Sequence, residues 1–193
     1  MEDLQGRVDA ALQQAGQHPE VVEAASAETA AMERLAQLRR AERTLNQNAK
    51  AMGERAAALR EEALDALIDS STGGKPEFKA PKELTAMENQ GRQATRAIER
   101  LVERLIPAAE IEHLRAQSHA ASARARAIER IAQERAERVL EQLRGAVSEE
   151  IVLPVDLSKG VSGALLAYAA EFRNRAVQVA GTVEALEKRG RGN

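Results

Sequence analysis

A repeating series of apolar residues decides the fold, and it begins in residues 35–68, LAQLRRAERTLNQNAKAMGERAAALREEALDALI. One set recurs every seven positions and comprises Leu38, Leu45, Met52, Leu59 and Ala66. A second set lies three positions ahead of it and comprises Leu35, Ala49, Ala56 and Ala63. Apolar residues at this spacing form the buried seam of a coiled coil, so the segment is predicted to be a long helix packed against another helix.

The partner for this helix follows a break at residues 70–81, which contains Ser, Gly and Pro. After the break the same spacing returns in two further sets, which are Leu84, Gly91, Ile98 and Leu105, and Met87, Ala94, Leu101 and Ala108. Two such seams joined by a turn predict an antiparallel helical hairpin. A turn through residues 69–81 would place Met52 beside Ile98 and Ala49 beside Leu101. A slip of one heptad, which would place Leu59 beside Ile98 and Met52 beside Leu105, is the alternative.

Another apolar stripe lies near the C-terminus, with alternating spacings of four and three residues, in Leu165, Ala169, Phe172, Ala176, Val179, Val183 and Leu186. A stripe of this kind must be buried against other helices. We expect it to pack on the C-terminal part of the second hairpin helix. With a short N-terminal helix, it would complete a three- to four-helix bundle at the base of the hairpin.

The predicted fold class is therefore all-α, a long antiparallel coiled-coil hairpin with a bundle at its base. The 193 residues are expected to form a single elongated helical domain. Its predicted segments are a short helix at 1–17, a long helix at 19–69, a tip loop at 70–81, a long helix at 82–144, a strap at 145–157 and a C-terminal helix at 158–189. A kink is expected at Pro107, because proline lacks the helical N–H donor and clashes with the carbonyl four residues earlier.

The composition agrees with thin, closely packed helices. Alanine occupies 39 positions and arginine 22, whereas only three residues are aromatic. A net charge of -2 provides no overall attraction to nucleic acid or to an anionic membrane. The absence of cysteine excludes disulfides and thiolate metal sites. The N-terminus lacks the apolar stretch of a secretory signal, and no run is long enough to span a membrane, so a cytoplasmic location is expected.

No motif predicts catalysis, a cofactor or a metal. Gly73, Gly74 and Lys75 resemble part of a phosphate-binding loop, but the upstream glycine and the following Ser or Thr are missing, so a hairpin turn is the better interpretation. Glu110 and His113 have the spacing of half a di-iron site, but no second Glu-x-x-His exists. We therefore expect no enzyme activity, no cofactor and no small-molecule substrate.

Interaction candidates are easier to find. Arg92, Arg96, Arg100 and Arg104 recur every four residues, and such like charges repel one another unless they are compensated. Glu99 and Glu103 compensate them in part, and Glu54, Glu61, Glu62 and Asp65 could supply the rest across the hairpin. The alternative is binding of an acidic partner or an anionic surface. Nucleic acid is a poor fit, because base-stacking aromatic residues are absent from this region.

Apolar residues outside the seam form a second group of candidates, Met32, Leu64, Leu67 and Ile68. One partner helix cannot cover them, so a second copy of the chain is expected to do so, in a homodimer. The strap contains a third group, Ile151, Val152, Leu153 and Val155. This segment is expected to lie over the base of the hairpin, and the alternative is a docking peptide for another protein.

These patterns predict a non-enzymatic coiled-coil scaffold or adaptor that acts through self-association and protein–protein contacts. The alternative is a peripheral coat protein, whose amphipathic helices bind an anionic membrane or granule surface. No motif names a family, and the identity of a protein partner is not encoded in any of these patterns.

Overall fold

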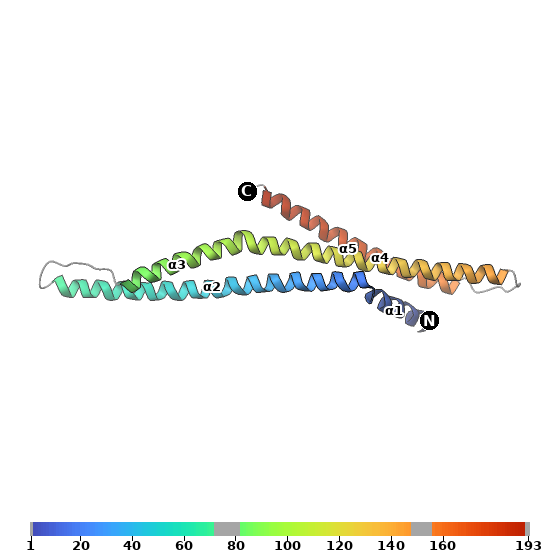
Figure 1. Ribbon diagram of the computed structural model, residues 1–193, viewed down its shortest axis with the longest axis horizontal. Coiled ribbons are helices and arrows are strands. Elements are labelled where there is room, and N and C mark those ends of the chain that lie inside the picture. Colours follow the sequence, from blue (N-terminus) through green and yellow to red (C-terminus); the bar gives the residue numbers. More distant parts are fainter. Residues whose placement is uncertain (1, 72–81, 148–155, 192–193) are drawn as a thin grey trace. The chain divides into compact units, whose positions relative to one another are not determined.

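The computed structural model describes residues 2–71, 82–147 and 156–191, which are helical except for a short turn at 17–18. The helices are α1 (Glu2–Gly16), α2 (Pro19–Ser71), α3 (Lys82–Arg100), α4 (Ile106–Val147) and α5 (Asp156–Arg191), with a π-helical turn, η1 (Leu101–Leu105), between α3 and α4 (Figure 1). The all-α prediction is confirmed, and each helix end lies within three residues of its predicted position. The rest of the predicted tip loop and strap lies outside the described residues.

The first residues of α2 show why the short N-terminal helix and the long helix separate where they do. The carbonyl of His18 accepts hydrogen bonds from the backbone N–H groups of Val21, at 2.9 Å, and Val22, at 3.0 Å. Pro19 fits the first position of the helix, because an N–H group at this position would have no hydrogen-bond acceptor within the helix. Glu20 in the first turn adds a negative charge at the positive end of the helix.

The chain divides into two units of dense internal contacts. Residues 1–33 and 110–193 form one unit, called here the bundle unit, and residues 34–109 form the other, called the hairpin unit. Each unit contains its own cluster of buried apolar residues. The organisation of the chain as one domain stays a prediction.

The bundle unit is built from α1, the start of α2, most of α4, and α5. Its core joins residues of all four helices: Val8, Ala11, Ala15, Val21, Ala24, Ala120, Ala123, Ala127, Ile128, Ile131, Ala132, Val161, Leu165 and Ala169. More than half of these side chains are alanine, so the helices can approach closely. The predicted three- to four-helix bundle is confirmed.

The C-terminal stripe provides the largest fully buried side chain of this core. Leu165 is 0% exposed, and Ala169, Ala176 and Val183 are also buried. Phe172, which was expected to be enclosed, is only half-buried. The guanidinium of Arg124 lies 5.9 Å from the centre of its ring and covers part of the aromatic face.

Polar contacts hold α5 against α4 alongside this stripe. The Ser118 hydroxyl donates a hydrogen bond to the Ala176 carbonyl at 3.0 Å. Two ion pairs, Arg173 with Glu129 and Arg115 with Glu187, join the same two helices. Both arginines are more than half exposed, so the apolar stripe contributes most of the stability and the ion pairs add little.

The hairpin unit contains the antiparallel pair predicted from the heptad spacing (Figure 1). Leu35, Leu101, Ile106 and Ala109 form its buried cluster, and Leu38 and Leu45 pack against them. Elsewhere along α2 the seam is covered less completely. Ala49, Met52, Leu59 and Ala63 are half-buried, and only Ala56 is buried among the predicted seam residues from 49 to 66.

A π-helical turn lies immediately before Pro107, where the kink was expected. The N–H of Ile106 bonds to the carbonyl of Leu101, five residues earlier. Pro107 has no N–H to donate to the carbonyl of Glu103, four residues earlier, so the regular helical hydrogen bond is missing here. The π-turn contains one residue more than a regular α-helical turn, which shifts the side of the helix on which all later residues lie. Leu105, which was predicted to lie in the seam, is therefore 40% exposed, and Ile106 and Ala109 are buried instead. The sequence prediction of Leu105 and Ala108 as seam residues was wrong for this reason.

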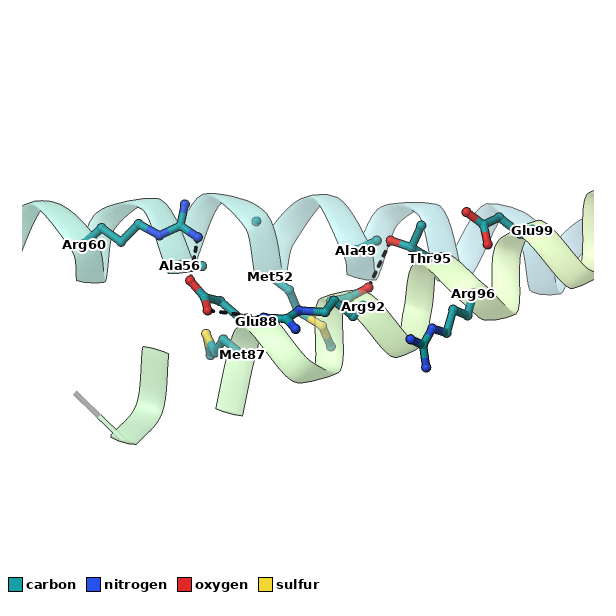
Figure 2. A pocket seen from close by; sticks show the side chains of 12 residues that line it. Ala49, Met52, Ala56, Arg60, Met87, Glu88, Arg92, Thr95, Arg96 and Glu99 are labelled. Carbon is teal, nitrogen blue, oxygen red and sulfur yellow. Dashed lines mark hydrogen bonds and ion pairs between the residues drawn. The ribbon is translucent and has the colours of Figure 1, made fainter. Parts of the chain in front are cut away.

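The register of the hairpin also differs from the prediction. In Figure 2, Ala49 and Ala56 of α2 line the same groove as Glu88 and Thr95 of α3, whereas the predicted register placed Ala49 beside Leu101. Leu101 belongs instead to the cluster with Leu35, on which Leu38 and Leu45 pack. The register is therefore shifted toward the N-terminal end of α3. The seven-residue spacing alone could not select it, because a shift of one heptad preserves both seams.

The core of the bundle unit gives a stability prediction. Leu165→Ala should lower the free energy of unfolding by about 2–5 kcal/mol, because it removes a fully buried side chain and leaves a cavity. Urea unfolding followed by circular dichroism measures the change. Leu166→Ala is the matched control, since Leu166 is 52% exposed and its truncation should cost under about 1 kcal/mol. Equal losses in the two variants would contradict this description of the core.

The register gives a crosslinking prediction, which is simple to test because the chain has no cysteine. Met52→Cys combined with Gly91→Cys should be linked within one chain by a short bismaleimide, because both residues line the same groove. Met52→Cys combined with Ile98→Cys tests the register expected from the sequence. Mass spectrometry of dilute protein distinguishes links within a chain from links between chains. More efficient linkage of the 52/98 pair would restore the original register.

Candidate protein-interaction site

A groove lies between α2 and α3 in the part of the hairpin unit where the seam is half-buried. Its volume is about 620 Å³. It is lined from α2 by Ala49, Met52, Gly53, Ala56 and Arg60, and from α3 by Met87, Glu88, Gly91, Arg92, Thr95, Arg96 and Glu99 (Figure 2). The groove has an apolar floor and a charged rim, as a helix-binding surface does.

The floor combines small residues with two methionines. A Cβ atom built on Gly53 or Gly91 would meet no heavy atom within 4 Å, so the space beside both backbones is open. Met52 and Met87 provide the bulk of the floor. Methionine has a flexible, polarizable side chain that adapts to differently shaped apolar partners. Another helix could therefore approach closely at the glycines and contact the methionines.

Glu88 organises the charged rim. Its carboxylate pairs with the guanidinium of Arg60 across the two helices, at 2.6 Å, and with Arg92 one turn further along α3, at 3.8 Å (Figure 2). One carboxylate thus faces two cations, and the rim keeps a surplus of positive charge. Both arginines are more than half exposed, so these pairs contribute little to stability but remain accessible to another acidic group.

The arginine ladder is only partly compensated. Arg92 contacts Glu88 on its own helix, while Arg96, Arg100 and Arg104 are exposed and form no ion pair within the described part of the chain. The expected compensation across the hairpin is wrong for these residues. Glu54 pairs instead with Lys50, at 3.9 Å. Glu61, Glu62 and Asp65 are exposed and have no ionic partner among the described residues.

The apolar residues predicted outside the seam are mostly exposed. Leu64 is 54% exposed and Ile68 is 62% exposed, and both belong to the hairpin unit. Leu67 is half-buried. Met32 is 52% exposed and belongs to the bundle unit. Leu64 and Ile68 lie one helical turn apart on α2, which places them on the same side of that helix.

The predicted strap residues Ile151, Val152, Leu153 and Val155 lie outside the described residues, as do Gly73, Gly74 and Lys75. His113 is within hydrogen-bonding distance of Gln117, with 3.2 Å between Nε2 atoms. Residues 2–71, 82–147 and 156–191 contain no group of three or more His, Asp or Glu side chains that could hold a metal ion. None of the helices in these ranges has the length and apolar character that crossing a membrane requires.

Sequence reasoning singled out Arg92 and Arg96 but missed the other half of the groove. Glu88 and Arg60 are polar residues beside a seam, and only the register brings them together. Gly53 carried a usable signal, because a glycine inside a long helix costs about 1 kcal/mol relative to alanine and suggests a close approach of another backbone. The spacing of Ala49, Gly53 and Ala57 places three small residues on adjacent turns of α2.

No protein-family model matches this chain, and comparisons with curated proteins and with solved structures find no match either. The candidate site therefore depends on the geometry and chemistry of these residues alone.

Proposed function

We propose that this protein is a non-enzymatic coiled-coil scaffold or adaptor that acts through self-association and contacts with other proteins. The observation that supports the proposal is the groove between α2 and α3, with its apolar floor and arginine-bearing rim. Two helices that pack through alanine cover only part of each seam, and another helix on the groove would remove further apolar surface from water. Each Å² so buried contributes about 25 cal/mol.

A homodimer is the simplest assembly that provides such a helix, because a two-fold axis supplies every copy with the same contact. We propose a cytoplasmic location for this assembly. The chain has no cysteine, so the assembly forms without disulfides in any compartment. Contacts with a different protein would use whatever part of the groove and of the bundle unit the dimer leaves accessible.

Self-association is tested by light scattering coupled to size exclusion. We expect a mass of about twice the 20.9 kDa of one chain at micromolar concentration. Sedimentation equilibrium over a range of concentrations gives the dissociation constant. A mass of one chain throughout that range would contradict the self-association on which the scaffold proposal depends.

Binding to an anionic membrane or granule surface is a second candidate, favoured by one specific observation. Arg96, Arg100 and Arg104 have no ion-pair partner among the described residues, and Val102 and Leu105 beside them are 45% and 40% exposed. Cationic and apolar side chains together are what an interfacial helix presents to anionic lipid. Each arginine near an anionic membrane surface contributes about 1 kcal/mol to the free energy of binding.

Pelleting with vesicles that contain phosphatidylserine tests this candidate. If it holds, the protein pellets in low salt and is released at high salt, because the attraction between exposed charges is screened. Arg100→Glu combined with Arg104→Glu should abolish pelleting, whereas Arg39→Glu combined with Arg40→Glu, elsewhere in the hairpin unit, should preserve most of it. Absence of pelleting in low salt would leave the scaffold as the sole proposal.

A further inference from the structure

We propose that the groove between α2 and α3 is occupied by α2 of a second copy of this chain, running antiparallel about a two-fold axis. The inference rests on the proposed self-association and identifies the surface that would form it. The contact uses one side of α2, called here the docking stripe, which comprises Gly53, Ala57, Arg60, Glu61, Leu64 and Ile68.

The docking stripe is continuous with the groove. Residues three or four positions apart lie on one side of an α-helix, so Gly53, Ala57 and Leu64 share a side with Arg60 between them. Gly53 and Arg60 line the groove. Leu64 and Ile68 extend the same side beyond it and are 54% and 62% exposed. Leu64 and Ile68 therefore form an apolar surface on α2 just outside the groove, where they could contact the groove of another copy.

Size complementarity favours an antiparallel arrangement. If the two-fold axis passes between residues 60 and 61, Ile68 of the second copy meets Gly53, and Leu64 of the second copy meets Ala57. Each large side chain thus faces a small one, and the axis repeats both contacts. Gly53 is open on this side, since a Cβ there would meet no heavy atom within 4 Å. The approach of an isoleucine requires that free space.

Charge complementarity selects the same arrangement. The axis brings Arg60 of each copy beside Glu61 of the other. Glu61, Glu62 and Asp65 form an acidic turn without ionic partners among the described residues. The rim that this turn approaches carries three cations, Arg60, Arg92 and Arg96, and two carboxylates, Glu88 and Glu99, so one positive charge is in excess. A parallel arrangement would instead place the acidic turns of the two copies beside each other, where they repel.

Gly53→Leu tests the close approach directly. Leucine fits the open side of Gly53 and is the better helix former, so each chain keeps its helix content by circular dichroism, whereas the second copy is displaced. We expect the dimer dissociation constant to rise at least tenfold. The matched control is Gly181→Leu in α5, which is equally open and should leave that constant unchanged. An unchanged constant in Gly53→Leu would overturn the proposal.

A disulfide trap provides a test that does not depend on weakening the dimer. Ala57→Cys and Leu64→Cys in one chain lie two turns apart, about 10 Å along the helix, so they cannot bond to each other. Mild oxidation should therefore give a covalent dimer of the double variant, while either single variant stays uncrosslinked. Crosslinking of Leu64→Cys alone would indicate parallel helices or an axis at residue 64, and either result would overturn the proposal. The proposal would also be overturned if a double variant that light scattering shows to be dimeric gave no crosslink.

A charge exchange completes the test. Glu61→Arg should weaken the dimer, because Arg60 and the new arginine repel each other across the axis. Combining it with Arg60→Glu restores opposite charges at both contacts and should recover at least part of the lost affinity. Failure of recovery would contradict the pairing of positions 60 and 61. A wild-type chain that is monomeric at all concentrations would contradict the scaffold proposal as well. If the chain is a dimer whose dissociation constant none of these substitutions changes, only the assignment of the interface to the docking stripe would be wrong.

Discussion

Burial of alanine between long helices is the constraint on which the rest of this structure depends. Alanine favours helix and allows two backbones to approach closely, but each buried methyl removes little apolar surface from water. The bundle unit meets this constraint by combining four helices around many small side chains and one fully buried leucine. In the hairpin unit α2 packs against a single partner, the segment formed by α3, η1 and the first residues of α4, and the middle section of the pair remains half-covered. The groove is thus a direct result of composition and helix number.

The helices themselves could be predicted from the sequence almost completely. Pro19, Pro81 and the glycines of the break limit the segments, and the spacing from Leu35 to Ala63 specifies which side of α2 faces α3. The stripe through Leu165 and Val183 likewise predicted the contact side of α5. These features are local, because they depend on helical periodicity and on residues that start or stop a helix.

The features that could not be predicted are relations between residues far apart in the sequence. The two seams still face each other after a shift of one heptad, so the register depends on which bulky and small residues pack best. The pairing of Arg60 with Glu88 follows from that register and from nothing in either local sequence. The exposure of Leu105 has a different cause, since a proline disturbs helical phase in several ways and the sequence does not specify which one occurs.

The π-helical turn at Leu101–Leu105 has a consequence for how the length of this chain can vary. Apolar residues repeat as one series up to Leu101 and as another from Ile106, and the two series differ by a single residue. An insertion or deletion inside a regular coiled coil rotates every later side chain away from its partners. Here the loss of one residue within the turn would join the two series into one uninterrupted heptad pattern. The turn is therefore a position where this segment could lose one residue while the apolar residues on either side stay in the seam.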